Sequence, residues 1–503
     1  MAATVLTAAL CGIEAFPVEV EADISPGLSA FLVVGLPDAA VQEARERVKS
    51  AMKHADLPFP RTKITINLAP ADSRKAGTGF DLPMAAALLT AHGDLPPAAP
   101  LKRLLVGELA LDGKLRPVPG VLSLAMLAAK LGAEELIVPK QNGAEARLVP
   151  GITVRIAEHL KEVAGHICGR TQLPEAPARN VESPDEHLGS EDMSAVRGQE
   201  QAKRALEIAA AGAHNILLQG PPGSGKTLLA RSLPTILPRP TVEEALEITR
   251  IHSVMGLLPP GGQIGWRPFR SPHHSASGIA LVGGGSVPKP GEISLAHRGV
   301  LFLDEFPEFS RSVLEYLRQP LEDGVVTVAR AQGTVTFPAR FLLVAAMNPC
   351  PCGYATDPDR PCICSPLHIE RYKKRISGPL LDRIDLAIEV PKVPTDKLTE
   401  LEPGEPSGAI RQRVQAARDR QTARYAGCAA KTNAELSSDQ VRRLIQPEAQ
   451  AKSLLTQAVD RFRLSARAYF RVLKVSRTIA DLESSEQVEV RHVAEALQYR
   501  QVI

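Results

Sequence analysis

The sequence predicts an α/β protein of three parts: an N-terminal α+β domain, a central domain built on a parallel sheet, and a C-terminal helical domain. Three observations predict this class. Short apolar runs alternate with helical patterns over residues 1 to about 170, a strand, a glycine-rich loop and a helix follow one another from Asn215 to Leu237, and the pattern is almost wholly helical beyond Pro394. At roughly 150 residues per domain, 503 residues are enough for about two to four domains.

The composition excludes several classes of protein. Lys and Arg number 59 and Asp and Glu 56, a formal net charge of +3, which excludes a uniformly basic DNA-packaging protein and an acidic disordered chain. Aromatic residues make up only 4%, so any nucleic-acid site must be local and cannot rest on a wide stacking surface. No apolar run approaches about 18 residues, so no membrane span is expected.

The chain begins with an apolar stretch, Met1 to Cys11, that carries no Lys or Arg. A secretory signal peptide needs basic residues before its apolar run, so we expect a buried strand here. Seven cysteines, an odd number with four clustered at 350–364, favour a reducing cytoplasm over a disulfide framework.

Residues 1–170 are expected to form the first domain. The apolar runs at 64–70 and 104–111 predict strands, and the periodic runs at 41–52 and 121–132 predict helices. This mixture predicts an α+β domain with its own core.

A stretch rich in Pro, Glu, Ser and Asp, residues 171–192, is expected to be an exposed linker. Residues 193–395 should form the central domain, which opens with a helix at 199–212. The strands expected in it lie at 215–220, 300–305 and 341–349. Residues 396–503 should form the C-terminal helical domain.

The segment GPPGSGKT fits the phosphate-binding loop pattern G-x-x-x-x-G-K-[ST] and lies between a predicted strand and a predicted helix. The glycines let backbone N–H groups face the phosphates, Lys226 neutralises them, and Thr227 offers a hydroxyl to Mg²⁺. The expected nucleotide-binding residues are Gly220, Pro221, Pro222, Gly223, Ser224, Gly225, Lys226 and Thr227. The loop therefore predicts ATP and Mg²⁺ as cofactors.

Polar residues end two further apolar strands. Asp304 and Glu305 follow VLFL, where the first would hold Mg²⁺ and the second would polarise the attacking water. Asn348 ends FLLVAAM and is expected to orient that water or to contact the γ-phosphate. By themselves these residues would also fit an acidic turn and a turn-forming Asn before proline.

Two arginines are candidates for sensing the nucleotide. Arg383 follows a predicted short helix in PLLDRID, from where it can reach a neighbouring subunit's nucleotide. Arg467 begins a predicted helix that carries Arg471 and Lys474 on the same face. We expect Arg467 to act from the helical lid of its own subunit; a solvated basic face is the alternative for this stripe.

Together these segments resemble the AAA+ ATPases of the branch that contains the magnesium-chelatase motors and the MCM helicases. The strings PGEISLAHRGVLFLDEFPEF (290–309), MNPCPCGY (347–354) and RISGPLLDRIDL (375–386) are similar to the ComM/YifB subfamily of magnesium-chelatase-like proteins, over essentially the whole chain. The resemblance implies a hexameric ring, and a DNA branch-migration helicase that acts in homologous recombination during natural transformation. The residues alone indicate only an oligomeric ATP-driven motor.

Two insertions bear on the substrate. Residues 325–337 have a hairpin signature, and the resemblance places such a hairpin in the pore of the ring, with Arg330 near its tip available to DNA phosphates. Residues 266–285 are long, polar and glycine-rich, and by resemblance form a second pore element. The side chains that this element offers to phosphate are Arg267, Arg270, His273 and His274.

Four cysteines have the spacing C-x-C-x₉-C-x-C: Cys350, Cys352, Cys362 and Cys364. Four thiolates can enclose a tetrahedral Zn²⁺, which would be structural. C-x-C is less diagnostic of zinc than C-x-x-C, so reduced structural cysteines in a proline-rich loop remain the alternative.

The N-terminal stretches 67–89 and 107–125 resemble the Lon-type protease fold. Lon proteases use a Ser/Lys dyad, but the serine position falls at about Gly79 and the lysine position at Leu122. The resemblance therefore implies a catalytically inactive domain. Thr78 and Lys75 lie nearby and leave a protease as a minor alternative.

Two rival functions remain. A chelatase-like motor would use the same ATPase to remodel a partner protein, although no integrin-like metal site is visible here. A scaffold with an inactive nucleotide site is disfavoured by the intact Lys226, Asp304 and Glu305.

Overall fold

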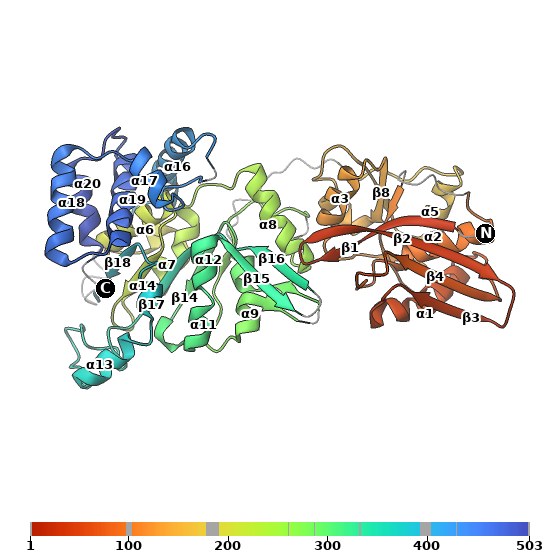
Figure 1. Cartoon of the computed structure of the whole chain (residues 1–503), viewed down its shortest axis with the longest axis horizontal. Helices are drawn as coiled ribbons and strands as arrows, with labels where there is room; N and C mark the ends of the chain where they lie inside the picture. The colour runs from red at the N-terminus through yellow and green to blue at the C-terminus, as the bar shows by residue number, and fades with distance from the viewer. Residues whose placement is uncertain are drawn as a thin grey trace.

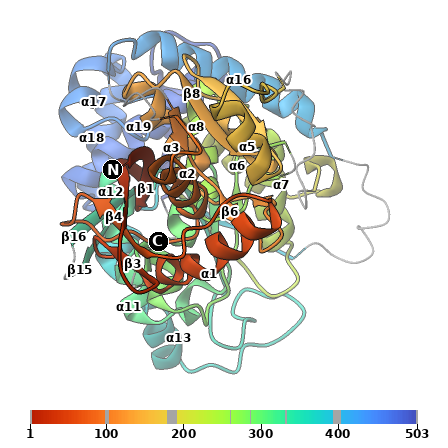
Figure 2. The same ribbon diagram turned by 90° about the vertical axis from the view of Figure 1, so that its right-hand side faces the viewer.

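The protein is described here from a computed structural model. It covers residues 3–96, 103–177, 191–259, 261–285, 287–330, 333–392, 404–428 and 430–500. The molecule is elongated, with the N-terminal strands at one end and the C-terminal helices at the other (Figure 1). Viewed along the long axis, the N-terminal part lies in front of the remainder of the chain (Figure 2).

The N-terminal part is built on a mixed sheet with the order β3-β4-β2-β1-β5-β8-β9. Its strands are β1 (Ala3–Cys11), β2 (Glu14–Ser25), β3 (Ala30–Val34), β4 (Lys63–Ala69), β5 (Arg103–Leu105), β6 (Glu108–Leu109), β7 (Leu115–Arg116), β8 (Glu135–Pro139) and β9 (Thr153–Ala157). Its helices are α1 (Ala39–His54), α2 (Asp81–His92), α3 (Val121–Lys130), α4 (Gly143–Ala146) and α5 (Leu160–Ile167). β2 pairs antiparallel with β1 and β4, whereas β5, β8 and β9 run parallel.

Most elements expected in this part are confirmed: the opening strand, the strand at 64–70 and both helices. The single strand expected at 104–111 is wrong. The chain leaves the large sheet at Gly107, whose N–H donates to Gly79 O and whose carbonyl accepts from Leu82 N, and β6 then pairs only with β7. A glycine in a strand pattern was the available signal for this break.

The expected linker is shorter at its start than predicted. Leu173 and Ala176 are buried in the N-terminal cores, and Arg155 Nη1 donates to Leu173 O at 3.0 Å. Residues 171–177 thus belong to the N-terminal part rather than to an exposed linker, and 178–190 lie outside the described residues. The domain boundaries at 192 and 395 stay predictions.

The central sheet is entirely parallel, with the order β11-β14-β17-β10-β18. Its strands are β10 (Ile216–Gln219), β11 (Phe269–Arg270), β14 (Val300–Leu303), β17 (Leu342–Met347) and β18 (Leu386–Glu389). The runs ILLQ, VLFL and LLVAAM are buried throughout, which is typical of strands covered on both faces. The carboxyl ends of β10, β14 and β17 meet at one edge of this sheet.

Helices surround the sheet and form the connections. They are α6 (Glu200–Gly212), α7 (Lys226–Ile236), α8 (Val242–Val254), α9 (Gly278–Val282), α10 (Glu292–Leu295), α11 (Arg311–Glu315), α12 (Arg318–Asp323), α13 (Pro366–Lys373) and α14 (Gly378–Leu381). Short 3-10 helices lie at Lys140–Asn142, Met193–Ala195 and Phe306–Glu308.

The C-terminal part is helical, as predicted for the residues beyond 404. Its helices are α16 (Ser407–Arg424), α17 (Ser438–Leu444), α18 (Ala449–Phe462), α19 (Ala466–Leu482) and α20 (Val490–Gln498). They share one apolar core with α6, α7 and one face of the sheet. Inside this part the buried Asp481 accepts hydrogen bonds from Arg424 Nη1 at 3.0 Å and Asn433 Nδ2 at 2.9 Å, which fixes α16 against α19.

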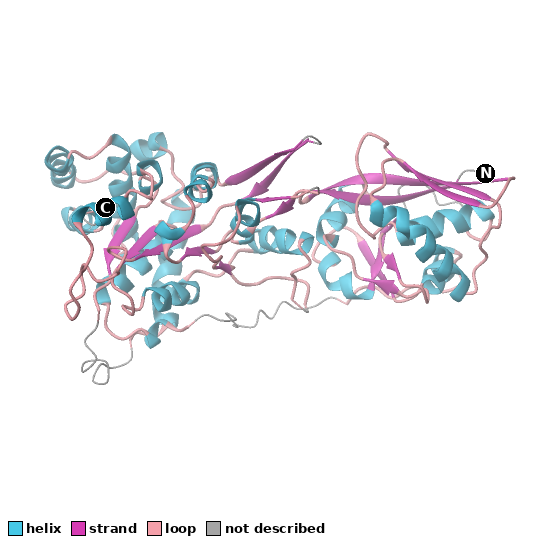
Figure 3. Ribbon diagram, turned by 90° about the horizontal axis from the view of Figure 1, so that it is seen from below, coloured by secondary structure: helices cyan, strands magenta, loops and turns pink. Residues whose placement is uncertain are grey.

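The two inserted segments take distinct forms. The predicted hairpin is confirmed as β15 (Val325–Arg330) paired with β16 (Gly333–Pro338), and in Figure 3 it extends toward the N-terminal part. The segment 266–285, expected as an irregular loop, supplies the edge strand β11 and the short helix α9, followed by β12 (Gly283–Gly284), which pairs with β13 (Lys289–Pro290). Within the part of the chain that the structure describes, no helix is long and apolar enough to cross a membrane.

Candidate nucleotide site

The glycine-rich loop joins the end of β10 to the start of α7. Gly223 and Gly225 have φ values of 76° and 92°, a left-handed backbone that glycine adopts without steric cost. Gly225 is the N-cap of α7 and provides no side-chain hydrogen bond to the helix. The first N–H groups of α7 are therefore left to an external acceptor, and the positive end of the helix favours an anion there. The loop fits a phosphate group.

Lys226 lies folded back over this loop. Its Nζ donates to Gly220 O and Pro221 O, each at 2.8 Å, and lies 3.4 Å from Asn348 Oδ1. The side chain is buried, and burial lowers the pKa of Lys226. A desolvated ammonium group held by two carbonyls gains a stronger partner when a phosphate arrives.

Thr227 and Asp304 meet across the carboxyl edge of the sheet. Thr227 Oγ1 donates to Asp304 Oδ2 at 2.9 Å, although 77 residues separate them in the chain. A hydroxyl and a carboxylate oxygen side by side are hard ligands of the kind that Mg²⁺ prefers. This donor set fits a magnesium ion beside the phosphate loop.

Glu305 lies next to this pair, in a left-handed backbone conformation with φ 51°. Such a conformation is strained for a residue with a Cβ and is found where the surrounding structure enforces it, often at functional sites. Glu305 Oε2 lies 3.2 Å from His274 Nδ1, and the Glu305 side chain is 55% exposed. The carboxylate is thus accessible to water but tied to the segment 266–285.

The pairing of His274 with Glu305 could not be predicted from the sequence, because a histidine in a polar loop carries no signal for its partner. The prediction that Arg267 is offered to phosphate is wrong. The Arg267 side chain is 11% exposed and donates to Pro238 O at 2.6 Å and to Glu244 Oε2 at 2.8 Å, so it is not available to phosphate in this state. The neighbouring His273 bonds Ser275 Oγ at 2.8 Å.

The two DNA-contact candidates differ in what the structure shows. Arg270 forms a two-pronged ion pair with Glu292, at 2.6 and 2.7 Å, and is not free to bind phosphate in this state. Arg330 ends β15 at the tip of the hairpin, and its side chain lies outside the described part of the structure.

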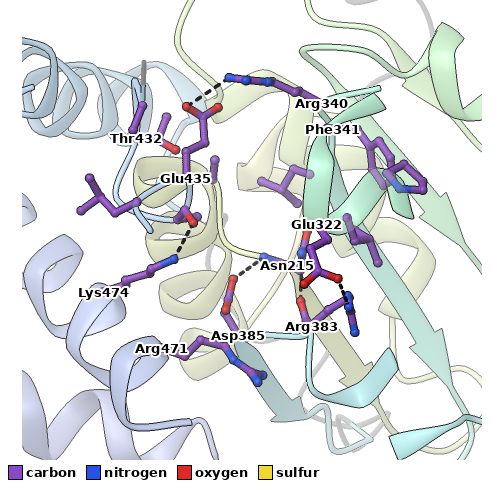
Figure 4. A pocket seen from close by; sticks show the side chains of 18 of the residues that line it. Asn215, Glu322, Arg340, Phe341, Arg383, Asp385, Thr432, Glu435, Arg471 and Lys474 are labelled. Carbon is purple, nitrogen blue, oxygen red and sulfur yellow. Dashed lines mark hydrogen bonds and ion pairs between the residues drawn. The ribbon is translucent and has the colours of Figure 1, made fainter. Parts of the chain in front are cut away.

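Arg383 and Arg467 lie together in a second region, a cavity of about 640 Å³ (Figure 4). None of the loop residues 220–227 lines this cavity among the residues that the structure describes. The expectation that Arg467 acts from the helical lid on the nucleotide of its own subunit stays a prediction. α19 shares a core with α6 and α16, and Arg471 Nη1 of α19 donates to Ile384 O, next to Arg383, at 3.3 Å. Arg383 bonds the Glu322 carboxylate, and the charge of Arg467 further lowers the pKa of Glu322.

The cavity is rich in cations. Its lining cations are Arg267, Arg298, Arg340, Arg383, Arg418, Arg467, Arg471 and Lys474, and its lining carboxylates are Glu244, Glu322, Asp323, Asp382, Asp385 and Glu435. Figure 4 shows Arg383 against Glu322, and Lys474 extending from α19. Lys474 Nζ donates to Ala434 O at 2.9 Å. Arg383 also donates to Pro379 O at 2.6 Å, while its buried Nε has no hydrogen-bond partner in the described structure. An unpartnered guanidinium N–H favours an anionic ligand.

The four clustered cysteines lie in the segment that follows Asn348. All four sulfur atoms lie within 4.8 Å of one another, and Cys350 Sγ is 3.4 Å from Cys352 Sγ and 3.6 Å from Cys362 Sγ. Hydrogen bonds from the backbone N–H groups of Tyr354 and Ile363 lower the pKa of the Cys352 thiol to about 6. The cluster fits a metal that binds thiolates.

The residues at the two Lon-like positions provide no catalytic side chains. Gly79 lies just before α2, and Leu122 is buried in α3 with its N–H donating to Glu145 Oε1 at 2.7 Å. The nearby Lys75 is buried and donates to Ser73 O at 2.8 Å. The inactive Lon-like character of this domain stays a prediction.

Comparison with known families gives three matches in chain order. Residues 20–142 match subunit ChlI of Mg-chelatase, 192–398 match magnesium chelatase subunit ChlI, and 404–500 match the C-terminal part of that subunit.

Individual relatives cover the whole chain. It is 46% identical to the competence protein ComM of Haemophilus influenzae over 505 residues, which spans 100% of this chain and 98% of ComM. It is 47% identical to YifB of Escherichia coli over 499 residues, spanning 99% of this chain and 96% of YifB. The magnesium-chelatase 67 kDa subunit of Chlorobaculum tepidum is 28% identical over 156 residues, 30% of this chain and 22% of that subunit. With similarity of this extent, the chain belongs to the ComM/YifB family of magnesium-chelatase-like AAA+ ATPases.

Proposed function

We propose that this chain is an ATP-hydrolysing, ring-forming DNA motor of the cytoplasm, a homo-hexameric branch-migration helicase that acts in homologous recombination during natural transformation. The observation that carries the ATPase is the convergence of Lys226, Asn348 and the Thr227–Asp304 pair at an uncapped helix N-terminus. The role in DNA uptake rests on the full-length similarity to a competence protein.

The residues at the sheet edge divide the work of ATP hydrolysis. Backbone N–H groups of the loop and of α7 hold the phosphates. When ATP binds, Lys226 gives up its hydrogen bonds to the two loop carbonyls and donates to phosphate oxygens instead. Thr227 and Asp304 would hold Mg²⁺, which when bound neutralises charge on the phosphates. Glu305 polarises the attacking water and Asn348 positions it, because both lie at the same edge beside Lys226 and Asp304.

The arginine-lined cavity completes the site of a neighbouring subunit. One subunit supplies the phosphate loop, and the next supplies Arg383 and, beside it, Arg467. Two features support this division. The cavity lies apart from the loop of its own chain, and it holds a buried guanidinium N–H that lacks an acceptor. The charge that develops on a transferring phosphoryl group is such an acceptor.

DNA contacts are proposed for the hairpin β15–β16 through Arg330, where one cation per subunit would grip the phosphate backbone. Arg270 contributes only when its pair with Glu292 opens, so it is the weaker contact. This assignment makes DNA binding dependent on salt.

A second candidate is a motor that remodels a partner protein; the matches to magnesium-chelatase subunits are what supports it. ATP turnover would be shared by both candidates. Stimulation by DNA distinguishes them, because a protein-remodelling motor has no reason to respond to DNA.

The test measures ATP turnover of the full-length protein with and without single-stranded, double-stranded and branched DNA. We expect DNA to stimulate the wild type several-fold, and Arg330→Ala to keep basal turnover but lose the stimulation. Lys130→Ala, a change at an exposed lysine of α3, serves as the control. Turnover that is the same with and without every DNA would support the protein-remodelling motor instead.

A further inference from the structure

The segment from Asn348 to α13 links the candidate nucleotide site to the four cysteines. β17 ends at Met347, Asn348 follows, and Cys350 is fully buried two residues later. At the other end, Cys364 directly precedes Ser365, the N-cap of α13. The four thiols therefore join the two ends of the segment 350–364 at a point next to Asn348.

The same segment packs directly on the phosphate loop. Gly353 has φ 86° and donates its N–H to Cys350 O at 3.0 Å. A Cβ at Gly353 would lie 2.7 Å from both Cγ and Cδ of Pro222 and 3.9 Å from Cγ of Asn348. The turn that carries Cys350 and Cys352 thus lies against the proline ring of the loop, with room for glycine only.

A second contact returns from α13. Tyr372 is 5% exposed; burial raises the pKa of its hydroxyl, and the backbone N–H of Asn348 lies close enough to that hydroxyl to oppose the rise. Asn348 is consequently fixed from two sides, by the cysteine turn and by the helix that the cysteines anchor.

The sulfur geometry matches one tetrahedral metal. Four Zn–S bonds of about 2.3 Å require sulfur atoms about 3.8 Å apart, and three of the observed separations are 3.4, 3.6 and 3.6 Å. Four thiolates with no open position indicate a structural rather than a catalytic ion. The residues between the two cysteine pairs are mostly exposed, so they have no core that could order them without the metal.

We propose that Cys350, Cys352, Cys362 and Cys364 bind one Zn²⁺ and that this ion positions Pro222 and Asn348, so that ATP binding depends on the metal. The inference rests on the proposed ATPase function of the loop. The cysteines are positioning residues: they touch neither nucleotide nor water, and they act through Gly353 and Tyr372.

The first experiment determines the metal content of the full-length, reduced protein. We expect one zinc per chain, and expect Co²⁺ in its place to give the intense near-ultraviolet absorption of cobalt–thiolate bonds. Cys362→Ser with Cys364→Ser should lose the metal, whereas Cys168→Ser, outside the cluster, should keep it. Metal well below one ion per chain in the wild type would overturn the site, whatever the ATPase does.

The second experiment separates positioning from mere stabilisation. Gly353→Ala keeps all four thiols but places a Cβ against Pro222, so it should retain one zinc per chain while its KM for ATP rises several-fold more than kcat falls. Gly427→Ala is the matched control, because Gly427 has φ 81° and nothing within 4 Å of an added Cβ.

The outcomes keep the two proposals apart. Equal KM values for Gly353→Ala and Gly427→Ala, in an active and zinc-loaded protein, would overturn the coupling and leave the ATPase intact. A wild type that binds zinc but neither binds nor hydrolyses ATP would overturn both the proposed function and the coupling, while the metal site would stand.

Discussion

The edge of the sheet that carries the phosphate loop and the cavity that carries Arg383 are opposite in their electrostatics. At the sheet edge the one loop cation, Lys226, is satisfied by carbonyls of its own loop, and the carboxylates of Asp304 and Glu305 lie at the same edge. In the cavity the cations outnumber the carboxylates, and Arg383 Nε has no partner within the described structure. The cavity therefore offers positive charge, and the sheet edge is where a phosphate that needs this charge would bind. This is the pattern expected of an active site divided between two subunits.

The largest effect is expected at the sheet edge. Lys226→Ala removes the amine that neutralises the phosphates, so ATP turnover should fall by about a hundredfold or more. Steady-state phosphate release measures it, with Lys130→Ala as the control. Near-normal turnover in Lys226→Ala would show that ATP is not hydrolysed at this edge of the sheet.

The cavity gives the next largest effect. Arg383→Ala should lower turnover by about a hundredfold, the cost of removing one donor to the charge that develops on the phosphoryl group, while ATP affinity stays close to that of the wild type. The informative measurement is the ATP turnover of a mixture of Arg383→Ala and Lys226→Ala subunits, each of which is expected to be inactive on its own. A divided site predicts partial recovery, because the intact loop of one variant meets the intact arginine of the other. If Arg383 acted on its own subunit's nucleotide, the mixture would stay inactive.

A smaller effect is expected from the link between Glu305 and the segment 266–285. His274→Ala releases Glu305 from its partner at 3.2 Å, so basal turnover should rise several-fold and the further increase on adding DNA should shrink. His54→Ala is the control, because His54 is exposed on α1 and bonds only Ser50 O of its own helix among the contacts described. Equal DNA stimulation in both variants would mean that His274 does not restrain Glu305.

The smallest effect concerns the folding stability that Glu247 contributes through its ion pair with Arg298, which lines the cavity. Hydrogen bonding to His297, together with Arg298, lowers the pKa of Glu247 from 4.5 to about 2. A carboxyl group with a lowered pKa stabilises the folded protein above pH 4.5, and this stabilisation is lost as the pH falls toward about 2. In a series of Tm measurements between pH 4.5 and about pH 2, the Tm of Glu247→Gln should therefore fall less steeply with decreasing pH than that of the wild type. Equal slopes of Tm against pH in the two proteins would contradict the pairing of Glu247 with His297 and Arg298.

The sequence predicted the sheet edge well because its signals are local. GPPGSGKT, the acids after VLFL and Asn348 after LLVAAM each combine a residue type with a strand end, and parallel strands bring such ends together. The spacing of the cysteines predicted a metal site less sharply, because C-x-C also fits reduced structural cysteines. The contact between Gly353 and Pro222 could not be predicted, since it depends on how the turn at Gly353 folds back.

The cavity was harder to predict because it depends on packing between distant segments. Arg467 and Arg383 line one cavity, although they lie far apart in the sequence. Arg467 lies on α19, which shares a core with α6 and α16, an arrangement that helical periodicity does not encode. Arg267 is basic and lies in a polar segment, yet Glu244 of α8 and two carbonyls bind it. The break at Gly107 depends on hydrogen bonds to Gly79 and Leu82, which lie far from it in the sequence.

The central claim is that this ATPase moves DNA strands, and the most direct test follows a labelled four-way junction in the presence of ATP. The account predicts that the wild type resolves the junction into its migrated products, and that Lys226→Ala or omission of ATP leaves the junction intact. A wild type that hydrolyses ATP at the same rate with and without DNA, and leaves the junction whole, would contradict it.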